Sequence, residues 1–131
     1  MRVLSVRQPW AWLLFHGKPI ENRDWATSHR GQLLIHASAG MTRRDYEAAR
    51  FFVEGFDWQL AQQIPPQSEI VRGALIGEVT LLNCIRFSNS EWFQGPVGWL
   101  FENPKIWETP LPAKGQLGLW EWDQLPEGRG R

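Results

Sequence analysis

The sequence predicts a single α+β domain in which at least six short strands form a small curved β-barrel with helices on its flanks. A length of 131 residues suits one domain with one sizeable core. Short segments rich in β-branched residues alternate with two or three helical patterns, and glycines interrupt the longest strand-like run. We expect the domain to span residues 1–122 and residues 123–131 to form a short frayed tail.

The first two elements are a strand and a short apolar helix. Residues 2–6 alternate polar and apolar side chains, which is typical of a strand. Residues 8–16 are apolar nearly all round, with Pro9 near a helix start and Gly17 just past a helix end. This segment is predicted to be a largely buried helix.

The next strand carries a group of charges. Pro19 keeps Lys18 out of helical dihedrals, and residues 20–25 alternate as a strand does. Because successive strand side chains point to opposite faces, Glu21 and Arg23 are expected on the same face.

The middle of the chain predicts a buried strand and an amphipathic helix. Residues 31–38 contain a central apolar run that indicates burial on both faces. Residues 42–54 have helical periodicity, and Thr42 with Asp45 three positions later is typical of a capped helix start. The two prolines within residues 62–69 predict a connection over the surface.

The C-terminal half predicts three more strands. Residues 73–85 form the longest strand-like run, in which Gly73 and Gly77 mark bends of the kind that curve a sheet into a barrel. Residues 97–104 and 115–122 are predicted as two further strands, and the proline-containing segment between them is expected to separate them.

Charge and hydropathy exclude several classes of protein. The formal net charge is zero, but residues 1–50 carry eight Lys and Arg against four Asp and Glu, whereas residues 51–112 carry three against seven. The chain opens without a signal-peptide pattern and contains no run of roughly 18 apolar residues. We therefore expect a soluble, cytoplasmic protein with no membrane partner.

The cysteine and histidine content predicts neither a metal site nor a cofactor site. Cys84 is the only cysteine, so we interpret it as a small buried hydrophobe in a reducing compartment. The three histidines lack metal-ligand spacing, and no phosphate-binding or dinucleotide glycine pattern occurs. His36 and Ser38 would lie on one strand face, but this hydroxyl–imidazole pair is predicted to be structural rather than catalytic.

The charged residues Lys18, Glu21 and Arg23 leave two interpretations open. They form either a solvated turn beside a buried helix, with ion pairs worth less than about 1 kcal/mol, or a charged site with that helix as one of its walls. In both cases we expect Lys18 to be partly exposed. The residue pattern alone does not decide between them.

The chain resembles the ASCH (activating signal cointegrator homology) domain family over nearly its whole length. Five blocks follow the family's order: SVRQPWAWLLFHGKPIENRDW, RGQLLIHAS, GEVTLLNC, GWLFENP and GQLGLW. The resemblance implies a β-barrel like that of PUA domains, with flanking helices and a cleft lined by the family signature Lys-x-x-Glu-x-Arg. Lys18, Glu21 and Arg23 match that signature position by position, although Gly17 directly precedes the lysine where the family usually has one residue in between.

The family function implied by the resemblance is binding of RNA, another single-stranded nucleic acid or a modified nucleoside. Trp10 and Trp25 are candidate stacking platforms, Glu21 is a candidate acceptor for a base amine, and Trp12 and Trp120 are assigned to the core. The predicted ligand-binding residues are Arg7, Gln8, Trp10, Lys18, Glu21, Arg23, Trp25 and Arg30.

Two other functions remain open. Some bacterial ASCH-like proteins are amidohydrolases acting on acetylated cytidine with the signature lysine and a threonine at the position of Glu21, and other members look like ribonucleases. In such a hydrolase Lys18, Glu21 and Arg23 are the candidate catalytic residues, with the carboxylate as base and Arg23 as oxyanion stabiliser. Alternatively, the many aromatic residues form a docking patch of a protein-interaction adaptor.

Overall fold

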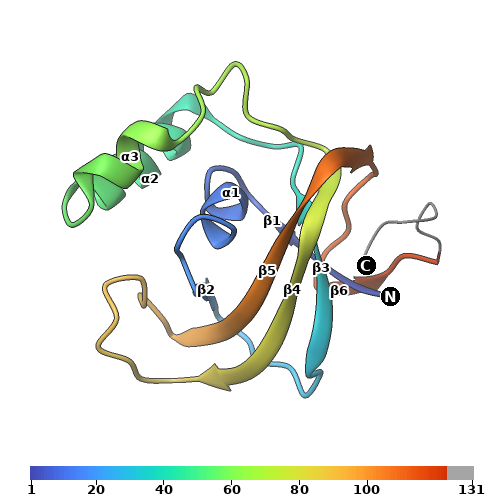
Figure 1. The fold of residues 1–131 in the computed structure, drawn as a ribbon. Coiled ribbons are helices and arrows are strands. Elements are labelled where there is room, and N and C mark those ends of the chain that lie inside the picture. The colour runs from blue at the N-terminus through green and yellow to red at the C-terminus, as the bar shows by residue number, and fades with distance from the viewer. Residues whose placement is uncertain (124–131) are drawn as a thin grey trace.

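A six-stranded sheet curls around a short helix in the computed structural model, which describes residues 1–123 (Figure 1). The strand order is β2-β5-β4-β3-β1-β6, and every neighbouring pair is antiparallel except β1 and β3, which are parallel. The strands are β1 (Arg2–Val6), β2 (Ile20–Arg23), β3 (Gly31–Ala37), β4 (Ala74–Ile85), β5 (Val97–Pro112) and β6 (Leu119–Glu121). The helices are α1 (Trp10–Leu14), α2 (Arg43–Glu54) and α3 (Trp58–Gln63). This arrangement confirms the predicted α+β fold with a PUA-like barrel.

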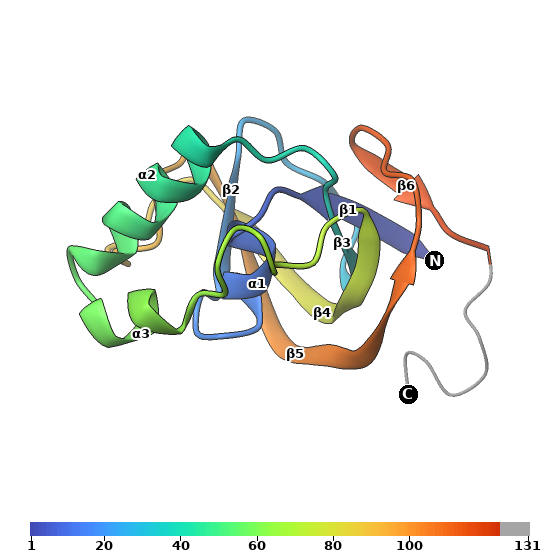
Figure 2. The same ribbon diagram turned by 90° about the horizontal axis from the view of Figure 1, so that it is seen from above.

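Helix α1 lies inside the curl of the sheet, as the views in Figures 1 and 2 agree. A side chain on Gly77 of β4 would collide with the Lys105 carbonyl oxygen and lie 2.8 Å from the Phe15 ring, so only glycine fits between helix and strand. The pairing of β4 with β5 shifts register beside Gly77, which confirms the predicted bend there. The apolar helix therefore contributes to the main core, together with Leu33, Ile35 and Trp99.

Helices α2 and α3 pack as a pair on one side of the molecule, away from β6 (Figure 2). Thr42 caps α2 as predicted, because its side-chain oxygen accepts from the Asp45 amide at 3.0 Å. Tyr46, Val53 and Leu60 form a second apolar cluster that includes Leu13 of α1. This cluster fixes the position of α1 from the side that the sheet leaves open.

Two expectations for the C-terminal half are wrong. Strand β5 runs through the segment expected to separate two strands: Ile106 pairs with Gly77 and Leu111 pairs with Leu75, and residues 107–110, which include Pro110, form a bulge between these pairs. A proline in a bulge does not have to donate a hydrogen bond to the ladder. The last predicted strand is also shorter, since residues 115–118 form a loop and only Leu119–Glu121 pairs with β1.

Helix α3 was not predicted, and its last two residues, Gln62 and Gln63, fall in the segment expected to be a surface connection. Asp57 caps it, with a side-chain oxygen 3.0 Å from the Leu60 amide. None of the helices within residues 1–123 is long and apolar enough to cross a membrane. The predicted frayed tail lies outside the described residues except for its first residue, Asp123.

Candidate functional site

The three signature side chains form one ion cluster. Lys18 Nζ lies 3.1 Å from Glu21 Oε1, and Arg23 Nη2 lies 3.0 Å from Glu21 Oε2. Arg23 also donates from Nε to the same Oε2 at 3.1 Å and from Nη2 to the Ser5 carbonyl oxygen at 2.7 Å. The carboxylate is thus held between two cations, and the cluster carries a net charge of +1 when all three groups are ionised.

The backbone around Gly17 brings Lys18 to this position. Gly17 adopts φ +115°, a conformation that L side chains rarely adopt, and this lets the chain leave α1 sharply. The Lys18 amide then donates back to the Leu13 carbonyl oxygen at 3.0 Å. In β2, Glu21 pairs with Trp99 and Arg23 with Val97 of β5, so the two side chains share a face as predicted.

Lys18 is buried, which corrects the expectation of a partly exposed lysine. Its side chain is only 3% exposed and that of Glu21 only 9%, whereas Arg23 reaches the surface with 22% exposed. The Lys18 ammonium also lies 5.1 Å from the centre of the Trp10 ring, close enough for a cation–π interaction. Desolvation lowers the pKa of Lys18, and the Glu21 carboxylate opposes that shift. The interpretation as a solvated turn is therefore wrong for Lys18 and Glu21.

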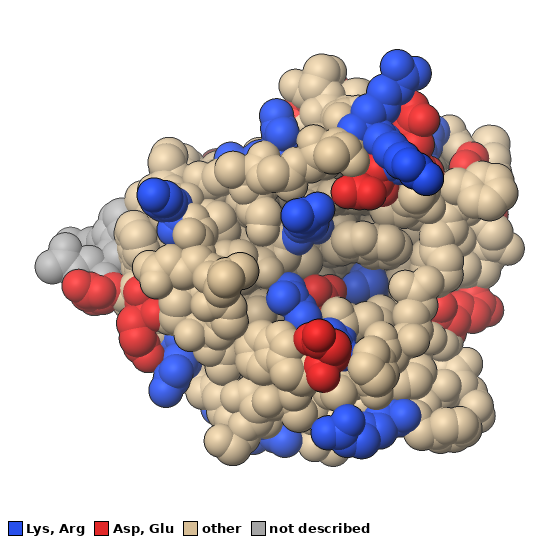
Figure 3. Space-filling view, turned by 180° about the vertical axis from the view of Figure 1, so that it is seen from behind, with Lys and Arg blue, Asp and Glu red and all other residues tan. Residues whose placement is uncertain are grey.

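A cleft of about 750 Å³ opens above this cluster. In Figure 3 a hollow near the centre of the face holds acidic and basic side chains, and further side chains of both charges lie around it. Glu21 and Arg23 line the cleft together with the Trp10 ring, while Arg7 and Lys114 contribute positive charge. The cleft combines an aromatic ring, a carboxylate whose charge is balanced, and exposed cations.

Of the eight residues predicted to bind the ligand, the structure brings four to the cleft lining: Arg7, Trp10, Glu21 and Arg23. Lys18 supports the cleft through its contacts with Glu21 and Trp10.

The other three predicted ligand-binding residues have different roles. Gln8 is buried and bonds the Trp12 amide and the Val71 carbonyl oxygen. Trp25 packs edge-on against Trp99 of the core, with ring centres 4.8 Å apart. Arg30 bonds backbone carbonyl oxygens and Asn83 outside the cleft lining. These three do not join the cleft because their contacts are with the protein itself.

Comparison with known proteins identifies the same family as the resemblance of the sequence blocks. The family model for the ASCH domain matches residues 4–113. The chain belongs to the ASCH domain family. This family is associated with RNA binding in general.

Two curated relatives align with most of this chain. Activating signal cointegrator 1 of Homo sapiens is 32% identical over 133 aligned residues, and its counterpart in Mus musculus is 29% identical. Each alignment covers 92% of this chain and 22% of the relative. The chain therefore spans about a fifth of the length of the curated relatives it matches.

A hydrogen-bonded chain beside the signature was missed by the sequence analysis. His36 Nδ1 lies 3.0 Å from Ser5 Oγ, and His36 Nε2 lies 2.7 Å from the Ala113 carbonyl oxygen. Because that carbonyl oxygen only accepts, Nε2 carries the proton and Nδ1 accepts from the Ser5 hydroxyl. Trp120 Nε1 donates to the same hydroxyl at 3.1 Å. Burial lowers the pKa of His36, in keeping with a neutral ring.

Ser38 was considered as a hydroxyl partner of His36 and judged structural; the hydroxyl that bonds His36 is that of Ser5 on the neighbouring strand. Ser5 and His36 are opposite each other in the parallel register of β1 and β3. Both residues line the cleft, as do Ser38 and the loop Lys114–Gly118. No local signal in the sequence identifies a pair that depends on strand register.

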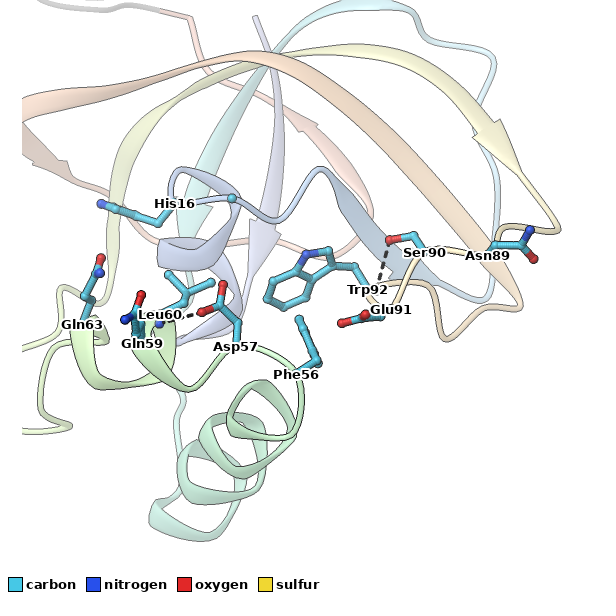
Figure 4. Close-up of a pocket in the computed structure, with 11 residues that line it drawn as sticks. His16, Phe56, Asp57, Gln59, Leu60, Gln63, Asn89, Ser90, Glu91 and Trp92 are labelled. Atoms are coloured by element: carbon cyan, nitrogen blue, oxygen red, sulfur yellow. Dashed lines mark hydrogen bonds between the residues drawn. The ribbon is translucent and has the colours of Figure 1, made fainter.

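A second cleft, of about 610 Å³, lies beside α3 and is shown in Figure 4. Its lining comes from α3, from residues 16–17 after α1, from residues 56–57 and from residues 89–92, and it includes the Phe56 and Trp92 rings, whose centres lie 4.7 Å apart in edge contact. Asp57 and Glu91 make it acidic, and no Lys or Arg of the described chain lines it. An acidic cleft repels phosphate, so the cleft at the signature is the better candidate for a nucleic acid.

The described residues offer no obvious metal site. Among residues 1–123, no group of three or more His, Cys, Asp or Glu side chains is placed to hold a metal ion. Cys84 is a free, half-buried cysteine whose sulfur lies 3.8 Å from the Thr27 carbonyl oxygen.

Proposed function

We propose that this ASCH domain binds single-stranded RNA and accepts one unstacked base in the cleft at its signature residues. The observation that carries the proposal is that Trp10 and the charge-balanced Glu21 line the same cleft. Stacking of a base on an aromatic ring is worth about 1–3 kcal/mol and needs no particular sequence. Trp10 supplies this surface.

Glu21 is suited to interact with the edge of the base. A carboxylate has about four lone-pair sites on its two oxygens, and Lys18 and Arg23 occupy only part of that capacity. A lone pair that neither cation occupies accepts a hydrogen bond from an exocyclic amine such as that of cytosine. The two cations hold the carboxylate in one orientation, so it is in position before the base enters.

Phosphate contacts fall to the exposed cations of the cleft. Lys18 is buried against Glu21 and Trp10, which leaves Arg7, Lys114 and the exposed part of Arg23 for the backbone of the RNA. The Arg7 side chain is 66% exposed, and its ion pair with Asp45 is long, at 3.4 Å. A surface pair of this kind contributes little, so Arg7 can turn to a phosphate at small cost.

Hydrolysis of an acetylated nucleoside or of RNA is a second candidate for the same cleft. The lowered pKa of Lys18 favours it, since a desolvated lysine is more easily deprotonated. Against it, the Lys18 ammonium is already paired with Glu21 and has only 3% of its side chain exposed. Binding without turnover is therefore our first proposal.

The test compares two tryptophans. Binding of a fluorescein-labelled single-stranded RNA is measured by anisotropy for the parent protein, for Trp10→Ala and for Trp58→Ala. Trp58 is 63% exposed on α3 and does not line the cleft, so it serves as the matched control. We expect Trp10→Ala to weaken binding by at least about fivefold and Trp58→Ala to bind like the parent. Equal loss in both variants would contradict a base site at Trp10.

A further inference from the structure

The loop between β5 and β6 contributes an apolar side chain to the cleft. All five residues of the loop Lys114–Gly118 line the cleft, and Leu117 is 98% exposed, more than any other large apolar residue of the described chain. Single exposed apolar residues are common on protein surfaces. Leu117 differs from them in its position, because it stands in the same cleft as Trp10 and Glu21.

Hydrogen bonds anchor this loop at both ends. Before it, the Ala113 carbonyl oxygen accepts from His36 Nε2 at 2.7 Å, and the Ala113 amide donates to the Gly73 carbonyl oxygen at 3.1 Å. After it, Trp120 Nε1 donates to Ser5 Oγ at 3.1 Å. Both anchors belong to the hydrogen-bonded chain of Ser5 and His36, so this chain holds the loop to β1 and β3.

The middle of the loop is held by close packing. A Cβ atom on Gly115 would lie 2.7 Å from His36 Cε1 and 3.0 Å from Ser5 Oγ, closer than such atoms normally approach. Gly118 has φ +66°, which also favours glycine. The backbone is therefore fixed against the cleft, while the Leu117 side chain has almost no contact within the protein.

We propose that Leu117 contacts the bound base and that the Ser5–His36 chain positions it to do so. This inference rests on the proposed function. A base that stacks on Trp10 has a second face, and an apolar side chain is suited to cover it because that contact removes apolar surface of both partners from water. Leucine has no hydrogen-bonding group, so this contact adds affinity without selecting a particular base.

Truncation of Leu117 tests this contact, with a leucine outside the cleft as the control. Leu117→Ala should weaken binding of a labelled oligoadenylate and of a labelled oligouridylate by about three- to tenfold, the loss expected when a leucine about half buried by the base is truncated. Leu117→Met, which keeps the apolar volume, should bind within about twofold of the parent. Leu82→Ala is the matched control, because Leu82 is 47% exposed on β4 and lies outside the cleft lining.

Melting temperatures should be unchanged in Leu117→Ala, since its side chain is exposed. Gly115→Ala tests the positioning part: the added methyl group must displace the loop from His36, so affinity should fall although Leu117 is intact.

The outcomes separate the two proposals. If Leu117→Ala binds like the parent while Trp10→Ala is weakened, the role of Leu117 is refuted and the base site stands. If the parent shows no RNA binding, or if Trp10→Ala binds as well as the parent, the proposed function is refuted and the role of Leu117 with it.

Discussion

Replacing Glu21 by Gln tests whether the signature is a buried ion cluster. The change keeps the shape of the side chain but removes the negative charge between Lys18 and Arg23. Breaking a buried ion pair by removing one partner typically costs about 3–5 kcal/mol, because the other charge stays buried without compensation. Lys18 fits this case with 3% exposed, whereas Arg23 reaches solvent and loses less. The Gln amide oxygen still accepts one hydrogen bond, so we expect a loss near the lower end, about 3 kcal/mol.

The assay is urea unfolding followed by tryptophan fluorescence. The nine tryptophans give a strong signal. In a separate thermal melt, a loss of about 3 kcal/mol corresponds to a melting temperature lowered by roughly 10 °C for a domain of this size. Glu47→Gln is the matched control, because Glu47 is 60% exposed in a surface pair with Arg43 at 3.0 Å. It should change stability by at most about 0.5 kcal/mol. Equal unfolding midpoints for Glu21→Gln and the parent would refute the buried cluster.

Three further predictions follow from the same geometry. Lys18→Ala should lose about 2–3 kcal/mol of stability by leaving a cavity, and Lys18→Met should regain most of that loss. Because burial lowers the pKa of Lys18 from 10.5, the unfolded chain binds more protons than the folded one near that pH. In urea titrations the parent should therefore gain stability relative to Lys18→Met as pH rises toward 10.5. Burial also lowers the pKa of His36 from 6.5, so the neutral ring stabilises the fold above that pH, and this stability is lost as pH falls through the pKa of the folded state. In urea midpoints measured below pH 6.5, His36→Gln should lack this acid-dependent loss. RNA affinity should fall as salt rises, with a slope of about −0.7 per phosphate contacted; Arg7→Gln should lower the slope by about that amount, and an unchanged slope would remove Arg7 from the phosphate contacts.

Local features of the fold were predictable because their causes lie close together in the sequence. The Thr42 cap of α2 needs only the Asp45 amide three residues on. The common face of Glu21 and Arg23 follows from the two-residue period of a strand. Gly17 marks the turn after α1 because glycine adopts a positive φ easily, although α1 itself ends earlier, at Leu14, than the predicted helix over residues 8–16.

Features that depend on long-range packing were not predictable from the chain alone. The burial of Lys18 requires the curled sheet to close around α1, and no neighbouring residue signals it. The Ser5–His36 pair depends on the parallel register of β1 and β3, because its two residues are 31 positions apart in the sequence. The charged signature could be identified by its resemblance to a family, but the loop that carries Leu117 reaches the cleft only through the path of β5 and β6.

The most direct test of the base site is to observe the indole N–H signals of the tryptophans by NMR while single-stranded RNA is added. Trp10 lines the cleft at the signature, Trp92 lines the acidic cleft, and Trp99 is buried with its indole bonded to the Trp25 carbonyl oxygen at 3.0 Å. The signals are assigned by conservative substitution of each tryptophan by phenylalanine. We predict that the Trp10 signal shifts with RNA concentration while the Trp92 and Trp99 signals stay in place. Shifts at Trp92 with none at Trp10 would contradict the proposed site.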